Sequence, residues 1–222
     1  MISAIIFDMD GLMIDSEPLQ KEAWQATARR YGRAIDDALF TRMLGLREVE
    51  STALVIRELG LSVEAKALWA ERNQLYLAGL PGRLRAMPGL YELLAELPPR
   101  GLCRAVATSG ERRYVETVMR ELELEGQWDA LVVAQDVTRG KPAPDVYLLA
   151  AQRLQLAPSQ CLVLEDAPNG IAAAKAAGMT CIAIPNKDTR ALDLSAADAV
   201  MPSLLAVRDH LDGLVGRKEL LP

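Results

Sequence analysis

The sequence predicts an α/β fold, with a doubly wound parallel sheet as its core and an all-helical domain inserted after the first strand. Two observations support this class. Residues 83–222 alternate short apolar runs with helical patterns of about a dozen residues, as expected for strands buried on both faces of a parallel sheet. Residues 14–82 show only helical patterns. We therefore predict a core of residues 1–13 and 83–222 and a helical cap of residues 14–82.

The first strand of the core is the apolar run of residues 5–7. The later strands are short apolar runs, and the helices between them have apolar residues at helical spacing. The predicted strands are 102–107, 131–134, 161–165 and 180–184, and the predicted helices are 89–97, 111–122, 144–155, 168–177 and 203–213. Such alternation places helices on both faces of one sheet.

The first helix of the inserted segment follows Ser16, a residue type that often caps a helix. Near its end, Ala65, Leu68, Trp69 and Tyr76 form the apolar stripe of a packed helix. Residues 79–82, rich in glycine and proline, close the segment. We read this block as a folded domain in its own right.

Composition excludes several functional classes. The chain has 222 residues, a formal net charge of -5 and a pI near 5.1, so it lacks the basic surface that nucleic acid requires. The first residues lack the basic lead of a signal peptide, and no apolar run is long enough to span a membrane. We expect a cytoplasmic protein that binds neither nucleic acid nor membrane, and a monomer, since no heptad repeat predicts a coiled coil. With His210 as the only histidine, zinc sites and Ser/His or Cys/His triads lack their parts.

Two carboxylates, Asp8 and Asp10, directly follow the first strand. Side chains two residues apart in an extended segment point the same way, so the pair would converge where the strand ends at Gly11. Like charges this close suggest a divalent metal site, an acid/base couple, or both. The alternative is that both residues are turn formers that close a surface strand.

Further polar residues follow other apolar runs at the same edge of the predicted sheet. Thr108 and Ser109 follow one strand, Glu165 and Asp166 end another, and Lys141 precedes a helix. Singly, Thr108 could cap a helix, Lys141 could be a solvated lysine, and the acidic pair could favour a helix dipole. Their coincidence at strand ends, where doubly wound sheets bind ligands, predicts a functional site.

In chain order, these segments resemble the four motifs of the haloacid dehalogenase superfamily, in particular its β-phosphoglucomutase-like branch of capped small-molecule phosphatases with a Rossmann-like core. The resembling stretches are residues 7–17 (FDMDGLMIDSE), 107–110 (ATSG), 141–145 (KPAPD) and 164–170 (LEDAPNG). They span nearly the whole chain, with an insertion of the expected size after the first stretch.

The resemblance implies a role for each carboxylate. Asp8 would be the nucleophile that forms an aspartyl-phosphate, and Asp10 the general acid/base that protonates the leaving alcohol and later activates water. The metal would be Mg²⁺, bound by the side chains of Asp8 and Asp166, the backbone carbonyl of Asp10, and Glu165 directly or through water.

The resemblance also implies a phosphate-binding set. Thr108, the Ser109 N–H and Lys141 would hold the transferring phosphoryl oxygens, and Gly11 and Asn169 lie beside them in the motifs. The helical cap would supply specificity through Glu17, Gln20 and Arg47. The predicted substrate contacts are therefore the eight residues Gly11, Glu17, Gln20, Arg47, Thr108, Ser109, Lys141 and Asn169.

Two positions bear on the choice of reaction within the superfamily. Asp10 favours phosphoryl transfer from an oxygen ester, since dehalogenases and phosphonate hydrolases lack this acid. Gln20 stands about where mutases of this branch carry a histidine. We therefore predict a Mg²⁺-dependent phosphatase of small phosphate monoesters, such as sugar or sugar-alcohol phosphates. The alternatives are a β-phosphoglucomutase-type sugar phosphomutase and a non-catalytic metabolite-binding module.

Overall fold

The structure is a computed structural model that describes residues 1–43, 46 and 48–216. It divides into two compact units, one made of Met1–Asp15 with the chain from Arg85 onward, the other of Ser16–Leu84. The divisions fall two residues beyond the positions 13 and 82 that we predicted. No helix in the described part of the chain has the length and hydropathy needed to cross a lipid bilayer.

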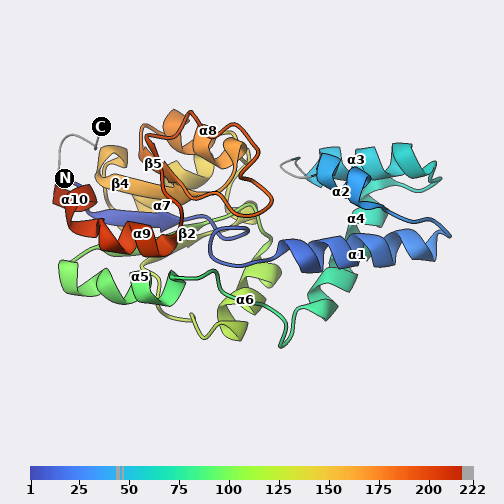
Figure 1. The fold of residues 1–222 in the computed structure, drawn as a ribbon, viewed down its shortest axis with the longest axis horizontal. Coiled ribbons are helices and arrows are strands. Elements are labelled where there is room, and N and C mark those ends of the chain that lie inside the picture. The colour runs from blue at the N-terminus through green and yellow to red at the C-terminus, as the bar shows by residue number, and fades with distance from the viewer. Residues whose placement is uncertain (44–45, 47, 217–222) are drawn as a thin grey trace. The chain divides into compact units, whose positions relative to one another are not determined.

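The core unit contains a parallel sheet with the strand order β3-β2-β1-β4-β5-β6 (Figure 1). Its strands are β1 (Ala4–Phe7), β2 (Cys103–Ala107), β3 (Ala130–Val132), β4 (Cys161–Glu165), β5 (Thr180–Ala183) and β6 (Ala199–Val200). β1 pairs with β2 on one side and with β4 on the other, so the strand order reverses there. The predicted doubly wound α/β class is confirmed.

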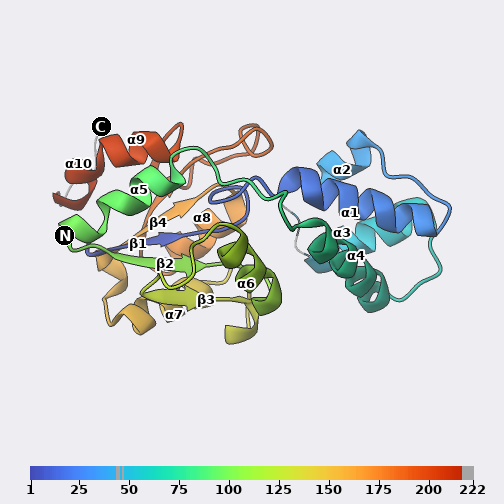
Figure 2. The same ribbon diagram turned by 90° about the horizontal axis from the view of Figure 1, so that it is seen from below.

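Helices cover both faces of this sheet (Figures 1 and 2). On one face lie α7 (Asp145–Leu154) and α8 (Pro168–Ala176), whose apolar side chains form one core with alternate residues of the strands. On the other lie α5 (Leu90–Glu96) and α9 (Leu204–Asp209), with α6 (Arg112–Glu121). Parallel strands extend from β1 in both directions, and the right-handed crossovers usual for such strands place helices on opposite faces of the sheet.

One prediction for the end of the core unit was wrong, and one strand there was missed. The helix predicted at 203–213 is two helices, α9 and α10 (Leu211–Gly216), which are separated at His210. β6 was not predicted, because two residues are too few to show a strand pattern. Short 3₁₀ helices also occur between the regular elements, at Pro98–Arg100, Ala134–Asp136 and Pro158–Gln160.

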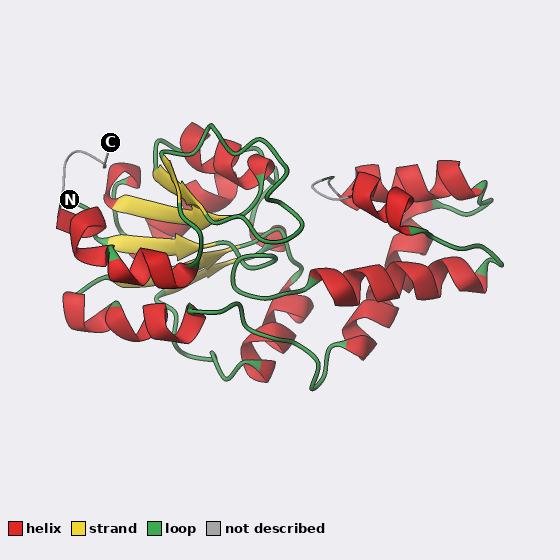
Figure 3. Ribbon diagram, in the orientation of Figure 1, coloured by secondary structure: helices red, strands yellow, loops and turns green. Residues whose placement is uncertain are grey.

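Helices are the only regular elements among the described residues of the inserted unit, and loops connect them (Figure 3). Its helices are α1 (Glu17–Arg30), α2 (Asp37–Met43), α3 (Glu48–Leu59) and α4 (Ala65–Gly79). They enclose a small core of their own, which includes Trp24, Leu54, Val55 and Leu68. Ser16 precedes α1, but its hydroxyl makes no capping hydrogen bond and instead accepts from the Gln20 amide at 3.2 Å.

The buried stripe of α4 differs from the predicted one. Ala65 is exposed, and Arg72 takes a place between Leu68 and Tyr76 with only 3% of its surface exposed. Its guanidinium carbon lies 5.1 Å from the ring centroid of Trp69 and 4.5 Å from that of Tyr76. Cation–π contacts with these rings explain how a charged side chain is accommodated in this helical core.

Candidate active site

The polar residues expected at the site come from the carboxyl edge of the sheet in the core unit. Asp8 directly follows β1, Thr108 directly follows β2, and Glu165 is the last residue of β4. Lys141 lies in the loop that precedes α7. Because β1 lies between β2 and β4, these strand ends are neighbours at the point where the strand order reverses. Doubly wound sheets bind ligands at this point.

A buried ammonium group joins two of the carboxylates. Lys141 Nζ lies 2.5 Å from Asp8 Oδ1 and 2.7 Å from Glu165 Oε1, and all three residues are buried. Burial by itself would lower the pKa of Lys141. The charges of Asp8 and Glu165 outweigh this effect and raise the pKa of Lys141 above its ordinary value, so the side chain remains a cation.

Asp8 holds its proton more tightly than an ordinary carboxyl group. Burial raises the pKa of Asp8 to about 8, against the lowering effect of Lys141. The charges of Glu165 and Asp10 raise it as well. One ammonium therefore does not neutralise this cluster of buried acids, and an additional cation would lower the cost of ionising Asp8.

A divalent metal ion fits the donor set. Asp8, Glu165 and Asp166 each offer one carboxylate oxygen, and these oxygens all lie within 4.8 Å of one another. All three residues are buried, and their three carboxyl groups outnumber the single ammonium group of Lys141. Hard anionic oxygens are the ligands that Mg²⁺ prefers. The contribution of the Asp10 backbone carbonyl stays a prediction.

Glu165 is held by donors at both of its oxygens. Oε1 accepts from Lys141 and from the Tyr147 hydroxyl, the latter at 2.6 Å. Oε2 accepts from the backbone N–H groups of Asp166 at 3.0 Å and Ala167 at 3.4 Å. Of the two modes predicted for Glu165, contact with a metal through water preserves these bonds, whereas direct ligation competes with them.

Two glycines make room for the carboxylates. A Cβ atom on Gly170 would lie 1.6 Å from Glu165 Oε1, so no larger residue fits beside this side chain. Gly11 has a φ of 80°, and a Cβ atom there would lie 2.2 Å from Asp166 Oδ2. Gly11 was predicted as a phosphate contact; its observed conformation and its closeness to Asp166 give it a structural reason to be glycine.

Three of the residues predicted to bind phosphate line a cavity of about 160 Å³. Thr108 is buried and its Oγ1 accepts from the Gly110 N–H at 2.9 Å, whereas Ser109 is exposed. Lys141 contributes to the same wall as both. The cavity is lined by Thr108, Ser109, Ala134, Val137, Thr138, Gly140, Lys141 and Val146. The structure thus brings together three of the predicted contacts.

Asp10 takes part in a separate contact. Its Oδ1 accepts a hydrogen bond from the hydroxyl of Tyr114, on α6, at 2.5 Å. Because the charge of Asp10 affects the pKa of Asp8, the two carboxylates interact electrostatically, as their spacing predicted. Tyr114 was not predicted, since an aromatic residue in an amphipathic helix has the pattern of an ordinary core residue.

The other predicted contacts are placed as follows. Asn169 is in the first turn of α8. Glu17 and Gln20 belong to the first helix of the inserted unit, where Gln20 Oε1 accepts from Arg72 Nη2 at 3.0 Å. Arg47 lies outside the described residues. The roles of these four side chains toward a substrate stay predictions.

Asn186 is a residue of the site that the sequence analysis missed. Its Nδ2 donates to the Gly11 carbonyl at 3.0 Å and to Asp166 Oδ2 at 2.8 Å. Its Oδ1 accepts from the backbone N–H groups of Asp188 at 2.8 Å and Thr189 at 3.0 Å. It closely follows β5, so the rule that selected polar residues after strands could have found it.

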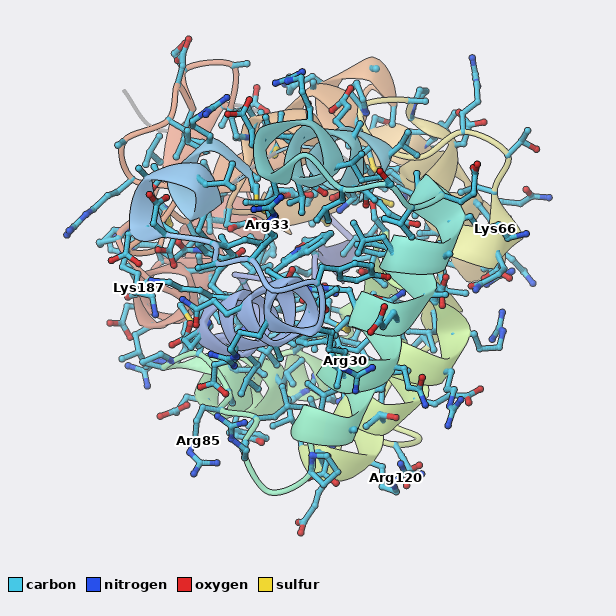
Figure 4. The ribbon with its side chains drawn as sticks, turned by 90° about the vertical axis from the view of Figure 1, so that its right-hand side faces the viewer. Arg30, Arg33, Lys66, Arg85, Arg120 and Lys187 are labelled. Carbon is cyan, nitrogen blue, oxygen red and sulfur yellow. The ribbon has the colours of Figure 1, made fainter. Side chains whose placement is uncertain are left out.

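The loop after β5 also contacts Asp15. Lys187, labelled in Figure 4, lies 3.2 Å from both carboxylate oxygens of Asp15. Together with Asn186, this ion pair joins the loop after β5 to residues 11–15. Both side chains of the pair are about half exposed, so the ion pair by itself contributes little to stability.

Comparison with known proteins bears on the family. A family model described as haloacid dehalogenase-like hydrolase matches residues 2–178. Validoxylamine A 7'-phosphate phosphatase of Streptomyces hygroscopicus subsp. limoneus is 37% identical over 212 residues, which cover 94% of this chain and 97% of that protein. Hexitol phosphatase A of Escherichia coli is 36% identical over 199 residues, which cover 90% of each.

Solved structures share the fold. CbbY from Rhodobacter sphaeroides, crystallised in complex with phosphate, superposes with a TM-score of 0.84 at 28% sequence identity. The match covers 93% of this chain and 96% of CbbY. The likeness therefore extends over both units of the chain as well as over the motifs.

Proposed function

We propose that this chain, which belongs to the haloacid dehalogenase-like hydrolases, is a Mg²⁺-dependent phosphatase of small phosphate monoesters. The observation that supports this best is the cluster at the end of β1. There Asp8 contacts Lys141 and shares with Glu165 and Asp166 a set of oxygens that could hold one cation.

The proposed substrates are sugar or sugar-alcohol phosphates. The names of two relatives support this class, since hexitol phosphatase A names a sugar alcohol and validoxylamine A 7'-phosphate phosphatase names the phosphate of a small organic compound. The proposal that Glu17, Gln20 and Arg47 recognise the alcohol part rests on the sequence alone.

In the first step, an Asp8 carboxylate oxygen attacks phosphorus and the bond between phosphorus and the alcohol oxygen breaks. Nucleophile and substrate are both anions, which at about 4 Å repel by about 4 kcal/mol at an effective dielectric near 20. Lys141 offsets part of this repulsion. A Mg²⁺ ion held by Asp8, Asp166 and the Asp10 carbonyl, with Glu165, would supply the remaining positive charge when bound.

Asp10 and the cavity side chains complete the proposed mechanism. Asp10 gives a proton to the departing alkoxide, and in the second step it takes a proton from the water that attacks the aspartyl-phosphate. That attack breaks the bond between Asp8 and phosphorus and releases inorganic phosphate. Thr108, the Ser109 N–H and Lys141 hold the phosphoryl oxygens as their charge develops.

The test is phosphate release from a panel of sugar, polyol, glycolate and nucleotide phosphates, with Mg²⁺ and with EDTA. We expect turnover only with the metal, and none after Asp8→Asn, which keeps the size of the side chain but removes the nucleophile. An Asp8→Asn protein that still hydrolyses p-nitrophenyl phosphate would contradict the mechanism.

The phosphomutase alternative makes a different prediction for the same substrates. Hydrolysis in ¹⁸O-labelled water places the label in the released phosphate, whereas a mutase rearranges a sugar phosphate without net hydrolysis. We favour hydrolysis because Gln20 stands about where the mutases carry a histidine. A non-catalytic binding module would show no metal-dependent turnover in either assay.

A further inference from the structure

Tyr114 contacts the proposed acid/base but has no part in the mechanism above. The residue is 9% exposed and lies in the first turn of α6. Its hydroxyl donates to Asp10 Oδ1 at 2.5 Å, a length typical of a hydroxyl bonded to a carboxylate. The donor comes from a helix packed on the sheet, whereas Asp10 lies in the loop beyond β1. Helix α6 therefore holds the side chain of Asp10, which belongs to a loop.

The backbone beside Tyr114 is shaped to admit its ring. A Cβ atom on Gly110 would lie 2.9 Å from Tyr114 Cδ1 and 3.3 Å from Met9 Cε, closer than side chains normally approach. Gly110 is itself fixed, because its N–H donates to Thr108 Oγ1 at 2.9 Å and its carbonyl accepts from the Ala134 N–H at 3.0 Å. The glycine of the segment 107–110 thus lets the ring lie against the loop.

Proton transfer depends on the placement of the acid. A general acid acts only when it lies within hydrogen-bond reach of the leaving oxygen. The Asp10 carboxyl is half-buried, so burial does not fully restrict it. A strong hydrogen bond from a fixed donor removes some of the orientations that such a side chain can adopt, and this reduces the fraction of time spent in unproductive ones.

We propose that Tyr114 is a positioning residue for Asp10, whose hydroxyl holds the carboxyl group where it can give a proton to the leaving alcohol. This inference rests on the proposed phosphatase function and adds a residue to it. Tyr114 acts through Asp10, so its effect is confined to the two steps in which Asp10 transfers a proton, and the first of these is the donation to the leaving alcohol.

Tyr114→Phe tests the inference, since it removes the hydroxyl and keeps the ring. The readout is kcat/KM, which reports steps up to phosphoryl transfer to Asp8, for p-nitrophenyl phosphate and for the best alkyl phosphate of the panel. We expect kcat/KM to fall about tenfold for the alkyl ester and by less than about twofold for the aryl ester, whose leaving group needs little protonation.

Tyr91→Phe is the matched control. The Tyr91 hydroxyl donates to the Leu122 carbonyl at 3.1 Å in the same unit, so the control also deletes one bonded phenol. It should leave kcat/KM for both esters unchanged. A second measurement repeats Tyr114→Phe in an Asp10→Asn background, where the hydroxyl has no acid to position and its loss should have no further effect on the alkyl ester.

The outcomes separate this inference from the proposed function. Equal losses on both esters after Tyr114→Phe, no loss on either, or a further tenfold loss in the Asp10→Asn background would overturn the role of Tyr114. Each of these results leaves the wild-type enzyme active and dependent on Asp8. A wild-type protein without Mg²⁺-dependent turnover would instead contradict the proposed function.

Discussion

Gly170→Ala is expected to destabilise the core unit, although alanine is the better helix former. Gly170 lies in α8, and a Cβ atom there would be 1.6 Å from Glu165 Oε1 and 1.9 Å from its Cδ. Real Cβ atoms essentially never approach within 3.0 Å, so the Glu165 side chain must move. It is not free to move at low cost, because it is buried and bonded at both oxygens.

The size of the effect follows from these bonds. Glu165 accepts from Lys141 at 2.7 Å, from Tyr147 at 2.6 Å, and from two backbone N–H groups. Each hydrogen bond to a charged group contributes about 1.5 to 3 kcal/mol, so the loss of two costs about 4 kcal/mol. Alanine recovers about 1 kcal/mol through its helix propensity. We expect the free energy of unfolding to fall by about 3 kcal/mol.

Urea unfolding with EDTA at neutral pH measures this difference, and Gly213→Ala provides the control. Gly213 also lies in a helix, α10, but a Cβ atom there meets nothing within 4 Å. Its replacement should leave the unfolding midpoint unchanged or raise it slightly. If Gly170→Ala unfolds at the same urea concentration as wild type or as Gly213→Ala, then Glu165 does not occupy the space beside Gly170 and the reasoning is refuted.

Two further predictions concern hydrogen-bonded carboxylates. Tyr147→Phe removes the buried donor to Glu165 and should lower the free energy of unfolding by about 2 kcal/mol. It should also raise about tenfold the Mg²⁺ concentration needed to protect the protein against urea. If both quantities are unchanged, this bond is dispensable. Burial raises the pKa of Asp136, but hydrogen bonds from Arg153 and the Val133 N–H outweigh burial and lower it below 3.8. The stability from Asp136 is therefore present above about pH 4 and lost as the pH falls through the folded-state pKa, so urea midpoints of Asp136→Asn should fall less between pH 5 and pH 3 than those of wild type; parallel pH profiles would contradict this.

The elements of the core unit could be predicted from local pattern. Runs such as residues 161–165 are apolar and flanked by helical spacing, and the strand there was predicted with the bounds that β4 has. Patterns fail where they are short or where tertiary packing overrides them. β6 has two residues, and Arg72 is buried in a stripe where only apolar residues were expected, because aromatic rings surround it.

Some residues of the candidate site could likewise be predicted from the sequence, and others could not. Asp8, Glu165 and Asp166 were predicted because polar residues at the ends of buried strands are conspicuous in a sequence. Lys141 lies before a helix and was predicted from the motif at residues 141–145. Tyr147 was not, because a tyrosine on the buried face of a helix looks like any core aromatic until the partner of its hydroxyl is known.

By itself, the sequence determined the α/β class, the insertion of a helical segment after the first strand, and the ordered motifs that identify the family. These features depend on residue type and on spacing along the chain. Only the tertiary structure decided that Tyr114 reaches Asp10, that Asn186 reaches Asp166, and that Gly170 leaves room for Glu165. Each of these is a contact between side chains or backbone of different segments, and its distance depends on how helices pack on the sheet, which no local pattern encodes.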